Sequence, residues 1–187
     1  MNDWFGTPVL PGLSSRDDLV TRAEEQALIE RIDGTSLSPF RFQGWTGKRL
    51  TSSYGWSYDF DAGRLQRGDA MPDWLLPIRD RAAVFAGLRA DDLVQALLIR
   101  YDPGAGIGWH KDRPAFEHVV GISLGAPSTM RFRRRVGVRF ERASAALPPR
   151  GAYYMIGEAR DGWKHSITEM EQVRWSVTFR SLCAKRA

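Results

Sequence analysis

The sequence predicts an α+β fold in which N-terminal helices pack on one sheet of a double-stranded β-helix, the jelly-roll of the cupin type. Apolar residues recur at helical spacing before residue 90, and from Val94 onward they alternate with polar ones. About eight short segments rich in Val, Ile, Tyr, Phe and Thr follow, separated by turns at Pro103-Gly104, Gly125-Ala126-Pro127, Gly137 and Gly151. The jelly-roll arranges eight strands in two facing sheets and so accounts for this number of strands, although a β-sandwich of another topology would also satisfy the pattern.

Two helices are expected ahead of these strands. Thr21 and Glu24 can form a capping box, in which each side chain accepts a hydrogen bond from the other residue's free backbone N–H, so a helix should run from about 22 to 32. The run from 74 to 85 places its apolar residues on one helical face, and its prolines fall in the first turns. This second helix should bury that stripe against a sheet.

Composition and charge indicate one folded domain, residues 1–187, with a basic surface. Hydrophobic residues make up 43% and charged residues 26%, and no repeat or linker interrupts the chain. The net charge of +5 favours a polyanionic partner, although many basic proteins bind no nucleic acid. Since Cys183 is the only cysteine and no stretch approaches 18 apolar residues, we expect a cytoplasmic protein with no membrane segment.

The sequence contains a candidate metal site. His110 and Asp112 follow a Gly-rich turn, and residues two apart in an extended strand point the same way with Cα atoms ~6.6 Å apart. A His-x-Asp pair alone is more often a surface turn, but His165 lies beyond several predicted strands, where folding can return it as a third ligand. Two histidines and one carboxylate form the facial triad of non-haem Fe(II) oxygenases.

A second polar cluster is expected on the last strand. Its alternation places Arg174, Ser176, Thr178 and Arg180 on one face and apolar residues on the other. On a solvated face two arginines would be unremarkable, whereas inside the fold they require anions, and the gap between them suits a short diacid. Tyr101, just before the metal turn, either donates to the same carboxylate as Arg174 or packs in the core.

Four ordered motifs, within a stretch from about residue 10 to 180, resemble the AlkB-like 2-oxoglutarate dioxygenases. The motifs are 101–112, 121–125, 157–167 and 174–180.

The resemblance implies a jelly-roll core, about 93–182, with Fe(II) held by His110, Asp112 and His165 as the catalytic centre. It further implies that Tyr101 and Arg174 bind the distal carboxylate of 2-oxoglutarate, while Arg180 lies near the carboxylate beside the iron. In such enzymes 2-oxoglutarate and O2 are converted to succinate and CO2 while a substrate C–H bond is hydroxylated. A hydroxylated N-methyl group then leaves as formaldehyde.

The resemblance also places a nucleotide-recognition lid at about 35–62. There Tyr54, Trp56 and Tyr58 alternate with small or polar residues, which gives an aromatic face beside Lys48 and Arg49 on which a base could stack. A hairpin that packs the same aromatics into the core is equally compatible with the pattern. The predicted substrate contacts are Arg49, Tyr54, Trp56 and Tyr58.

Six arginines on one predicted hairpin could follow a phosphate backbone or form an ordinary solvated face. They are Arg131, Arg133, Arg134, Arg135, Arg139 and Arg142.

Two positions depart from the family pattern. Ile99 stands where many relatives have an asparagine that contacts the cosubstrate, and Pro114 stands where base-repairing relatives tend to have a base-reading carboxylate. We therefore predict oxidative demethylation of N-alkylated bases in DNA or RNA, single strands preferred, with no obligate protein partner. The alternatives are hydroxylation or demethylation of a modified tRNA base or a protein side chain, and a non-catalytic nucleic-acid-binding jelly-roll.

Overall fold

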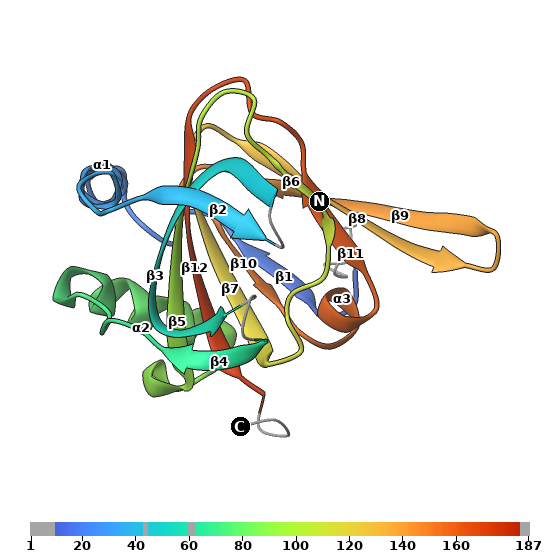
Figure 1. Ribbon diagram of the computed structural model, residues 1–187, viewed down its shortest axis with the longest axis horizontal. Helices are drawn as coiled ribbons and strands as arrows, with labels where there is room; N and C mark the ends of the chain where they lie inside the picture. Colours follow the sequence, from blue (N-terminus) through green and yellow to red (C-terminus); the bar gives the residue numbers. More distant parts are fainter. Residues whose placement is uncertain (1–9, 43–44, 60–62, 184–187) are drawn as a thin grey trace.

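Two antiparallel sheets face each other in the computed structural model, which describes residues 10–42, 45–59 and 63–183 (Figure 1). The small sheet has the strand order β6 (Ile107–His110), β11 (Lys164–Ile167), β8 (Ser128–Val136), β9 (Arg139–Leu147). The large sheet has the order β1 (Leu13–Arg16), β10 (Ala152–Met155), β7 (Phe116–Gly125), β12 (Arg174–Leu182), β5 (Leu93–Tyr101), β3 (Trp45–Asp59), β2 (Ser38–Phe42), and β4 (Arg64–Arg67) pairs with β3.

The eight strands from β5 to β12 correspond to the eight segments expected after Val94. Their pairing into two facing sheets, with β7, β12 and β5 adjacent at the centre of the large one, confirms the double-stranded β-helix with helices on one sheet. Strands β8 and β9 form a long hairpin that projects beyond the two sheets (Figure 1).

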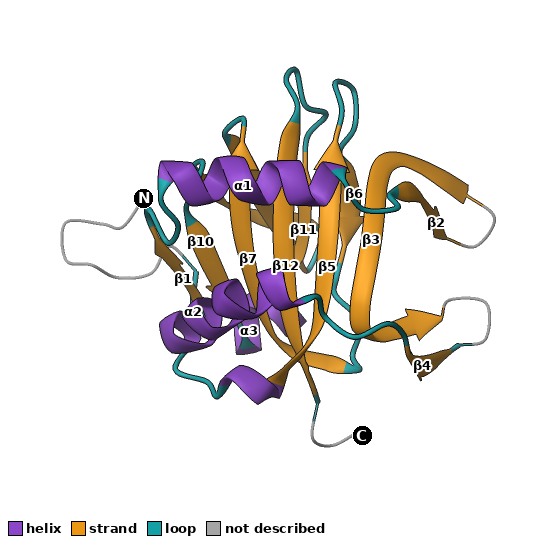
Figure 2. Ribbon diagram, turned by 90° about the vertical axis from the view of Figure 1, so that its left-hand side faces the viewer, coloured by secondary structure: helices purple, strands orange, loops and turns teal. Residues whose placement is uncertain are grey.

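Helices α1 (Arg22–Asp33) and α2 (Leu76–Ala86) lie across one face of the large sheet (Figure 2). The capping box predicted for the first helix is present, since the Thr21 hydroxyl accepts from the Glu24 amide at 3.2 Å and the Glu24 carboxylate accepts from the Thr21 amide at 2.8 Å. The second helix begins as a 3₁₀ turn at Asp73–Leu75, and a short α3 (Gly157–Asp161) precedes β11. Both helix predictions are confirmed, and no helix of the described ranges is long and apolar enough to cross a membrane.

The large sheet separates two hydrophobic clusters. On its helix side, Val177 and Phe179 of β12 pack with apolar residues of α1, α2 and the neighbouring strands. On its other side, Ile99 and Tyr101 pack with Phe132 and other residues of the small sheet. The predicted metal ligands and the two arginines of β12 lie in this second layer, between the sheets.

A glycine changes the course of β3. Gly55 has a φ of +75°, and a Cβ atom there would lie 2.0 Å from the carbonyl oxygen of Val94. Up to this residue β3 pairs with β5 of the large sheet, and beyond it β3 pairs with β4 instead. The strand therefore leaves the large sheet at Gly55.

Candidate active site

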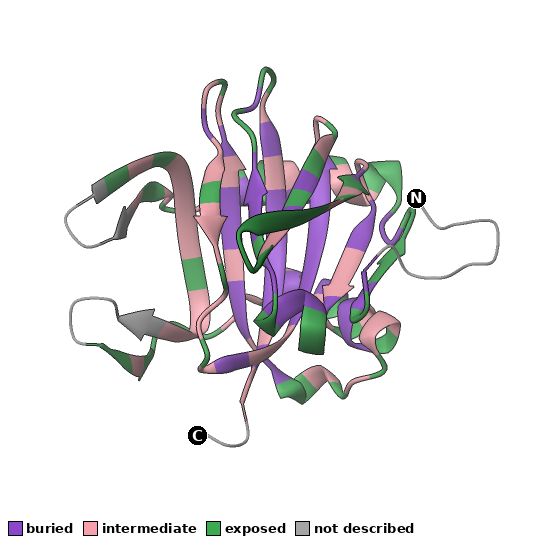
Figure 3. Ribbon diagram, turned by 90° about the vertical axis from the view of Figure 1, so that its right-hand side faces the viewer, coloured by how far each residue is buried: buried purple, intermediate pink, exposed green. Residues whose placement is uncertain are grey.

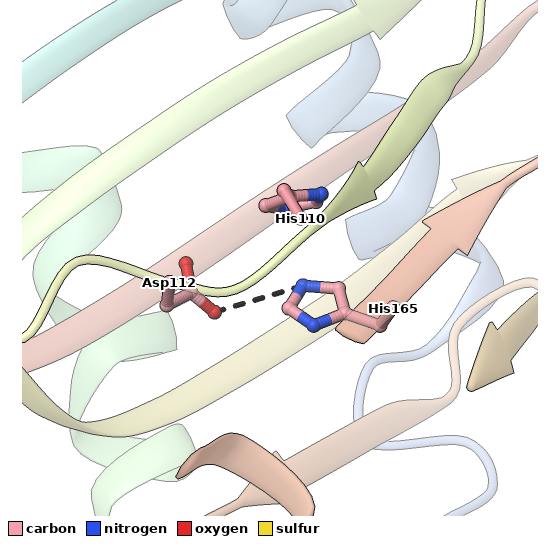
Figure 4. Close-up of side chains that lie close together, drawn as sticks. All are labelled: His110, Asp112 and His165. Carbon is pink, nitrogen blue, oxygen red and sulfur yellow. Dashed lines mark ion pairs between the residues drawn. The ribbon is translucent and has the colours of Figure 1, made fainter. Parts of the chain in front are cut away.

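Three side chains of the predicted metal triad meet between the sheets (Figure 4). His110 of β6 and His165 of β11 are register partners, with ring centroids 4.2 Å apart. Asp112 follows β6 two residues after His110, and the ligand atoms of all three residues lie within 4.8 Å of one another. The pairing of two strands therefore brings together ligands that are 55 residues apart in the sequence.

Electrostatics favour the metal-binding protonation state of these residues. Burial lowers the pKa of His165 to about 4 and also lowers that of His110. Burial alone would raise the pKa of Asp112, but the positive charge of Arg180 and the nearby histidines hold it at about 2. At neutral pH the site thus offers one carboxylate and two neutral imidazoles, the forms that coordinate a metal.

A backbone hydrogen bond determines the tautomer of His110. Its Nδ1 lies 2.9 Å from the carbonyl oxygen of Gly108, which can only accept, so Nδ1 carries the hydrogen. The lone pair of His110 Nε2 is then free for a metal, and Asp112 Oδ2 lies 3.7 Å from His165 Nε2. Two imidazole nitrogens and one carboxylate oxygen form a donor set that fits Fe(II) and leaves further coordination positions open.

Arg174 lies on the inner face of the large sheet, where no acidic side chain among the described residues pairs with it. It is 1% exposed, lies opposite Tyr101 with its Cζ 5.0 Å from that ring, and donates to the Ser123 hydroxyl at 2.7 Å. Its Nε and one terminal nitrogen are buried without a hydrogen-bond partner in the described part of the chain. Because an unpaired buried guanidinium is costly, this arrangement fits a site for a ligand carboxylate.

Arg180, at the other end of β12, is directed to the metal centre. It donates to Asp112 Oδ1 and to Gln95 Oε1, each at 3.0 Å. The two arginines of β12 therefore differ in their surroundings. Both terminal nitrogens of Arg180 are engaged by protein side chains, one of them by Asp112, and only its Nε has no partner among the described residues. Arg174 leaves its Nε and one terminal nitrogen unused there.

Residues 21–181 match the family model described as 2OG-Fe(II) oxygenase superfamily. The chain belongs to this superfamily. Its cofactor is Fe(II) and its cosubstrate is 2-oxoglutarate, and the triad and the open donors of Arg174 fit the two groups.

Known relatives place this oxygenase among the AlkB-like enzymes, which confirms the resemblance. It is 30% identical to an Arabidopsis thaliana protein named alkylated DNA repair protein ALKBH8 homolog, over 92% of this chain and 56% of that protein. It is 31% identical to the Xenopus tropicalis tRNA (carboxymethyluridine(34)-5-O)-methyltransferase alkbh8, over 84% of this chain and 25% of that protein. The chain thus spans between about a quarter and somewhat over half of these relatives' lengths.

A solved structure supports the fold of the oxygenase. The structure of OsALKBH1 superimposes with a TM-score of 0.72, covering 94% of this chain and 99% of that one, at 15% sequence identity. At this identity the likeness concerns the fold alone.

Tyr153 lies in the oxygenase site, and the sequence analysis missed it. Its ring occupies the space over Gly121, where a Cβ atom would lie 2.2 Å from the Tyr153 ring. Burial, and then the charge of Asp112, raise the pKa of Tyr153 to about 12, so its hydroxyl remains a donor at neutral pH. A glycine in the middle of a strand signals such a close approach, and Gly121 could have revealed it.

Ile99 lies on the same inner face, opposite Ser176 and 5% exposed. The structure therefore places an apolar side chain where the family pattern expects an amide.

Of the four predicted substrate contacts, the structure brings Arg49 to the metal centre. Its guanidinium stacks on Phe40 at 4.0 Å, and its charge acts to lower the pKa of His110. The pKa of Arg49 itself is lowered, mainly by burial and to a smaller extent by the positive charge of Arg180. Its Nε is buried and has no hydrogen-bond partner in the described ranges, so Arg49 has a donor available beside the iron site.

The predicted aromatic face does not form as one surface. Tyr54 pairs with Ala96 and packs against the helix-side cluster, so its position favours core packing over base stacking. Trp56 lies beyond the bend at Gly55, opposite Arg67 of β4, because the positive φ interrupts the alternation of the strand. The side chain of Tyr58, like part of the lid-like segment, lies outside the described residues.

Proposed function

We propose that this oxygenase oxidatively demethylates N-alkylated bases in DNA or RNA. The observation that carries the chemistry is the common location of the triad and of the open Arg174 donors between the sheets. The nucleic-acid substrate is supported by the names of relatives, which include a probable RNA/DNA demethylase ALKBH6 of Danio rerio that is 27% identical over 64% of this chain. The net charge of +5 is in accord with such a substrate.

Each residue of the site has a defined part in this reaction. The two neutral histidines and ionised Asp112 hold Fe(II), and Arg180 orients Asp112. Arg174 and Tyr101 receive the distal carboxylate of 2-oxoglutarate, because a guanidinium fork matches a carboxylate with two parallel hydrogen bonds. When bound, Fe(II) and 2-oxoglutarate supply oxidation of a substrate C–H bond by O2, with succinate and CO2 as products. The resulting N-hydroxymethyl group releases formaldehyde and leaves the base with an N–H.

We also propose that single strands are preferred over duplexes and that the enzyme is cytoplasmic. Pro114 offers no hydrogen bond where related repair enzymes read the base. A site with weaker base recognition has less to offset the few kcal/mol needed to extrude a paired base. The location rests on Cys183 being the only cysteine.

A second candidate is hydroxylation of a modified tRNA base. It is favoured by the relatives named for tRNA carboxymethyluridine, and by Arg49, whose free donor beside the iron site suits a base that bears a carbonyl or carboxylate substituent. In this case the hydroxylated group would remain on the base and no formaldehyde would form.

The test begins with anaerobic binding of Fe(II) and 2-oxoglutarate, followed by turnover with methylated oligonucleotides and with tRNA. Succinate and formaldehyde in equal amounts would support demethylation, and succinate without formaldehyde on tRNA would support hydroxylation. An unmethylated oligonucleotide and the His165→Ala variant serve as matched controls. Stimulation by a protein extract, with none by nucleic acid, would exclude both candidates.

A further inference from the structure

We propose that the outer face of the small sheet binds the phosphate backbone of the nucleic-acid substrate, at nucleotides beside the one that is oxidised. The identity of the partner rests on the proposed function, whereas the surface is assigned from its own geometry. We call this surface the cationic face. Its members are Trp109, Arg131, Arg133, Arg135, Arg142 and Lys164.

Strand register places these cations on one side of the sheet. Phe132 and its partner His165 point inward, toward the metal centre, so the neighbouring residues of each strand point outward. Lys164, Arg133 and Arg142 are successive register partners across β11, β8 and β9, and they form one row of positive charge. The cationic face is therefore the reverse side of the sheet that carries both histidine ligands.

On the opposite face of the same hairpin, Arg134 is neutralised by acidic side chains. Arg134 donates to Glu141, its register partner, and to Glu158 at 2.7 Å, and its Cζ lies 4.7 Å from the Trp163 ring. None of the five cations of the cationic face forms an ion pair with an acidic side chain among residues 10–42, 45–59 and 63–183. Acidic side chains therefore pair with an arginine on one face of the hairpin, whereas the positive charge of the cationic face is not balanced by such pairs.

Aromatic rings support the arginines of the cationic face. The Cζ of Arg133 lies 4.3 Å from the Trp109 ring and 5.1 Å from the Phe140 ring, and the Cζ of Arg131 lies 5.2 Å from Trp109. Cation–π contacts of this kind hold a guanidinium while using none of its N–H groups. The Nε of Arg133 is buried and donates to no acceptor in the described part of the chain. A guanidinium that is supported in this way keeps its terminal N–H groups for phosphate oxygens.

The spacing and location favour a nucleic-acid strand over other anions. Arg131, Arg133 and Arg135 alternate along β8 with a repeat of ~6.8 Å, comparable to the separation of successive phosphates in an extended strand. The hairpin that bears them projects from the body, and its outer part is exposed (Figure 3). Trp109 directly precedes the ligand His110 on β6, which is the edge strand of the small sheet. A nucleic acid must therefore pass around β6 to touch both the cationic face and the metal centre. Only substrates longer than a few nucleotides can do so.

The test compares two variants of the same hairpin. Arg133→Gln/Arg142→Gln removes two cations of the cationic face, and Arg134→Gln removes one from the opposite face. For a labelled single-stranded oligonucleotide, the double variant should bind roughly tenfold more weakly at low salt, and the slope of log K against log salt should fall by about 1.4 in magnitude, which is ~0.7 per lost contact. Arg134→Gln should bind like the wild type, and Arg133→Lys/Arg142→Lys should keep the wild-type salt slope because the charges remain.

Turnover separates the surface from the active site. With a long methylated oligonucleotide the double Gln variant should show a raised KM and an unchanged kcat, whereas a methylated trinucleotide should be turned over equally by all variants. Circular dichroism checks that each variant is folded. If the wild type binds and demethylates oligonucleotides but the double Gln variant binds them equally well, the inference is wrong and the proposed function stands. If the wild type binds anionic vesicles or an acidic peptide and no oligonucleotide, both fail.

Discussion

Strand β12 directs Val177 and Phe179 toward the helices and Arg174 and Arg180 toward the small sheet. The helix side is closed by apolar contacts, and each fully buried large side chain there stabilises the fold by about 1.5–3 kcal/mol. The inner side instead buries a guanidinium with unused donors, which costs free energy until an anion is bound. One strand thus stabilises the protein with one face and provides the reaction site with the other.

The largest expected effect on the inner face is the loss of turnover when a metal ligand is removed. His110→Ala, Asp112→Ala and His165→Ala should each reduce succinate formation to background. Each variant keeps only two of the three protein ligands, and two are too few to form the facial site for Fe(II). Each variant should remain folded, as judged by circular dichroism. Near-normal succinate production by any of the three would contradict the assignment of the triad.

The matching change on the helix face should act on stability instead. Phe179→Ala leaves a cavity in a fully buried cluster and should lower the free energy of unfolding by about 3–5 kcal/mol, measured by urea denaturation. The remaining folded enzyme should bind 2-oxoglutarate with near-normal affinity, because the removed side chain faces away from the site. A selective loss of 2-oxoglutarate affinity in a stable variant would show that the two faces are coupled.

Acid should destabilise the metal-free protein through the inner face. The folded-state pKa of His165 is about 4 and the ordinary value is 6.5, so between these values the unfolded chain binds a proton that the folded chain does not. Stability is therefore lost as the pH falls from 6.5 to 4, by about 3 kcal/mol from this residue. The lowered pKa of Asp112 contributes in the same direction only at still lower pH. The free energy of unfolding, measured by denaturation in the presence of a chelator, should depend less on pH between 6.5 and 4 in His165→Asn than in the wild type. An equal pH dependence of the two proteins would contradict the prediction.

The elements that follow from local pattern could be predicted from the sequence. The capping box at Thr21 located the first helix, and the change of hydrophobic period located the strands from Val94 onward. The triad was accessible because the chain has only 3 histidines, and because the spacing of His110 and Asp112 already suggested that their side chains point the same way.

What depended on distant backbone could not be predicted. The turn of β3 at Gly55 results from the close approach of the Val94 carbonyl, and it leaves Tyr54 with the core instead of with a base. Similarly, the run of arginines in β8 does not reveal that Arg134 is neutralised by Glu158, which belongs to α3. These outcomes depend on which distant segments meet, and local sequence patterns do not show that.

The smallest expected effect separates two neighbouring arginines on opposite faces of the large sheet. Arg174→Lys should raise the apparent KM for 2-oxoglutarate roughly tenfold, since a point charge replaces a planar fork that can donate two parallel hydrogen bonds to a carboxylate. Arg100→Lys is the matched control, because Arg100 lies one residue before Tyr101, opposite Trp175 on the helix side, and pairs with Asp33 at 3.1 Å instead of with a ligand. Initial rates of succinate formation at varied 2-oxoglutarate measure both. Equal increases in KM would mean that the diacid is not bound by Arg174, whereas a change confined to Arg174→Lys would place its distal carboxylate on the inner face of β12.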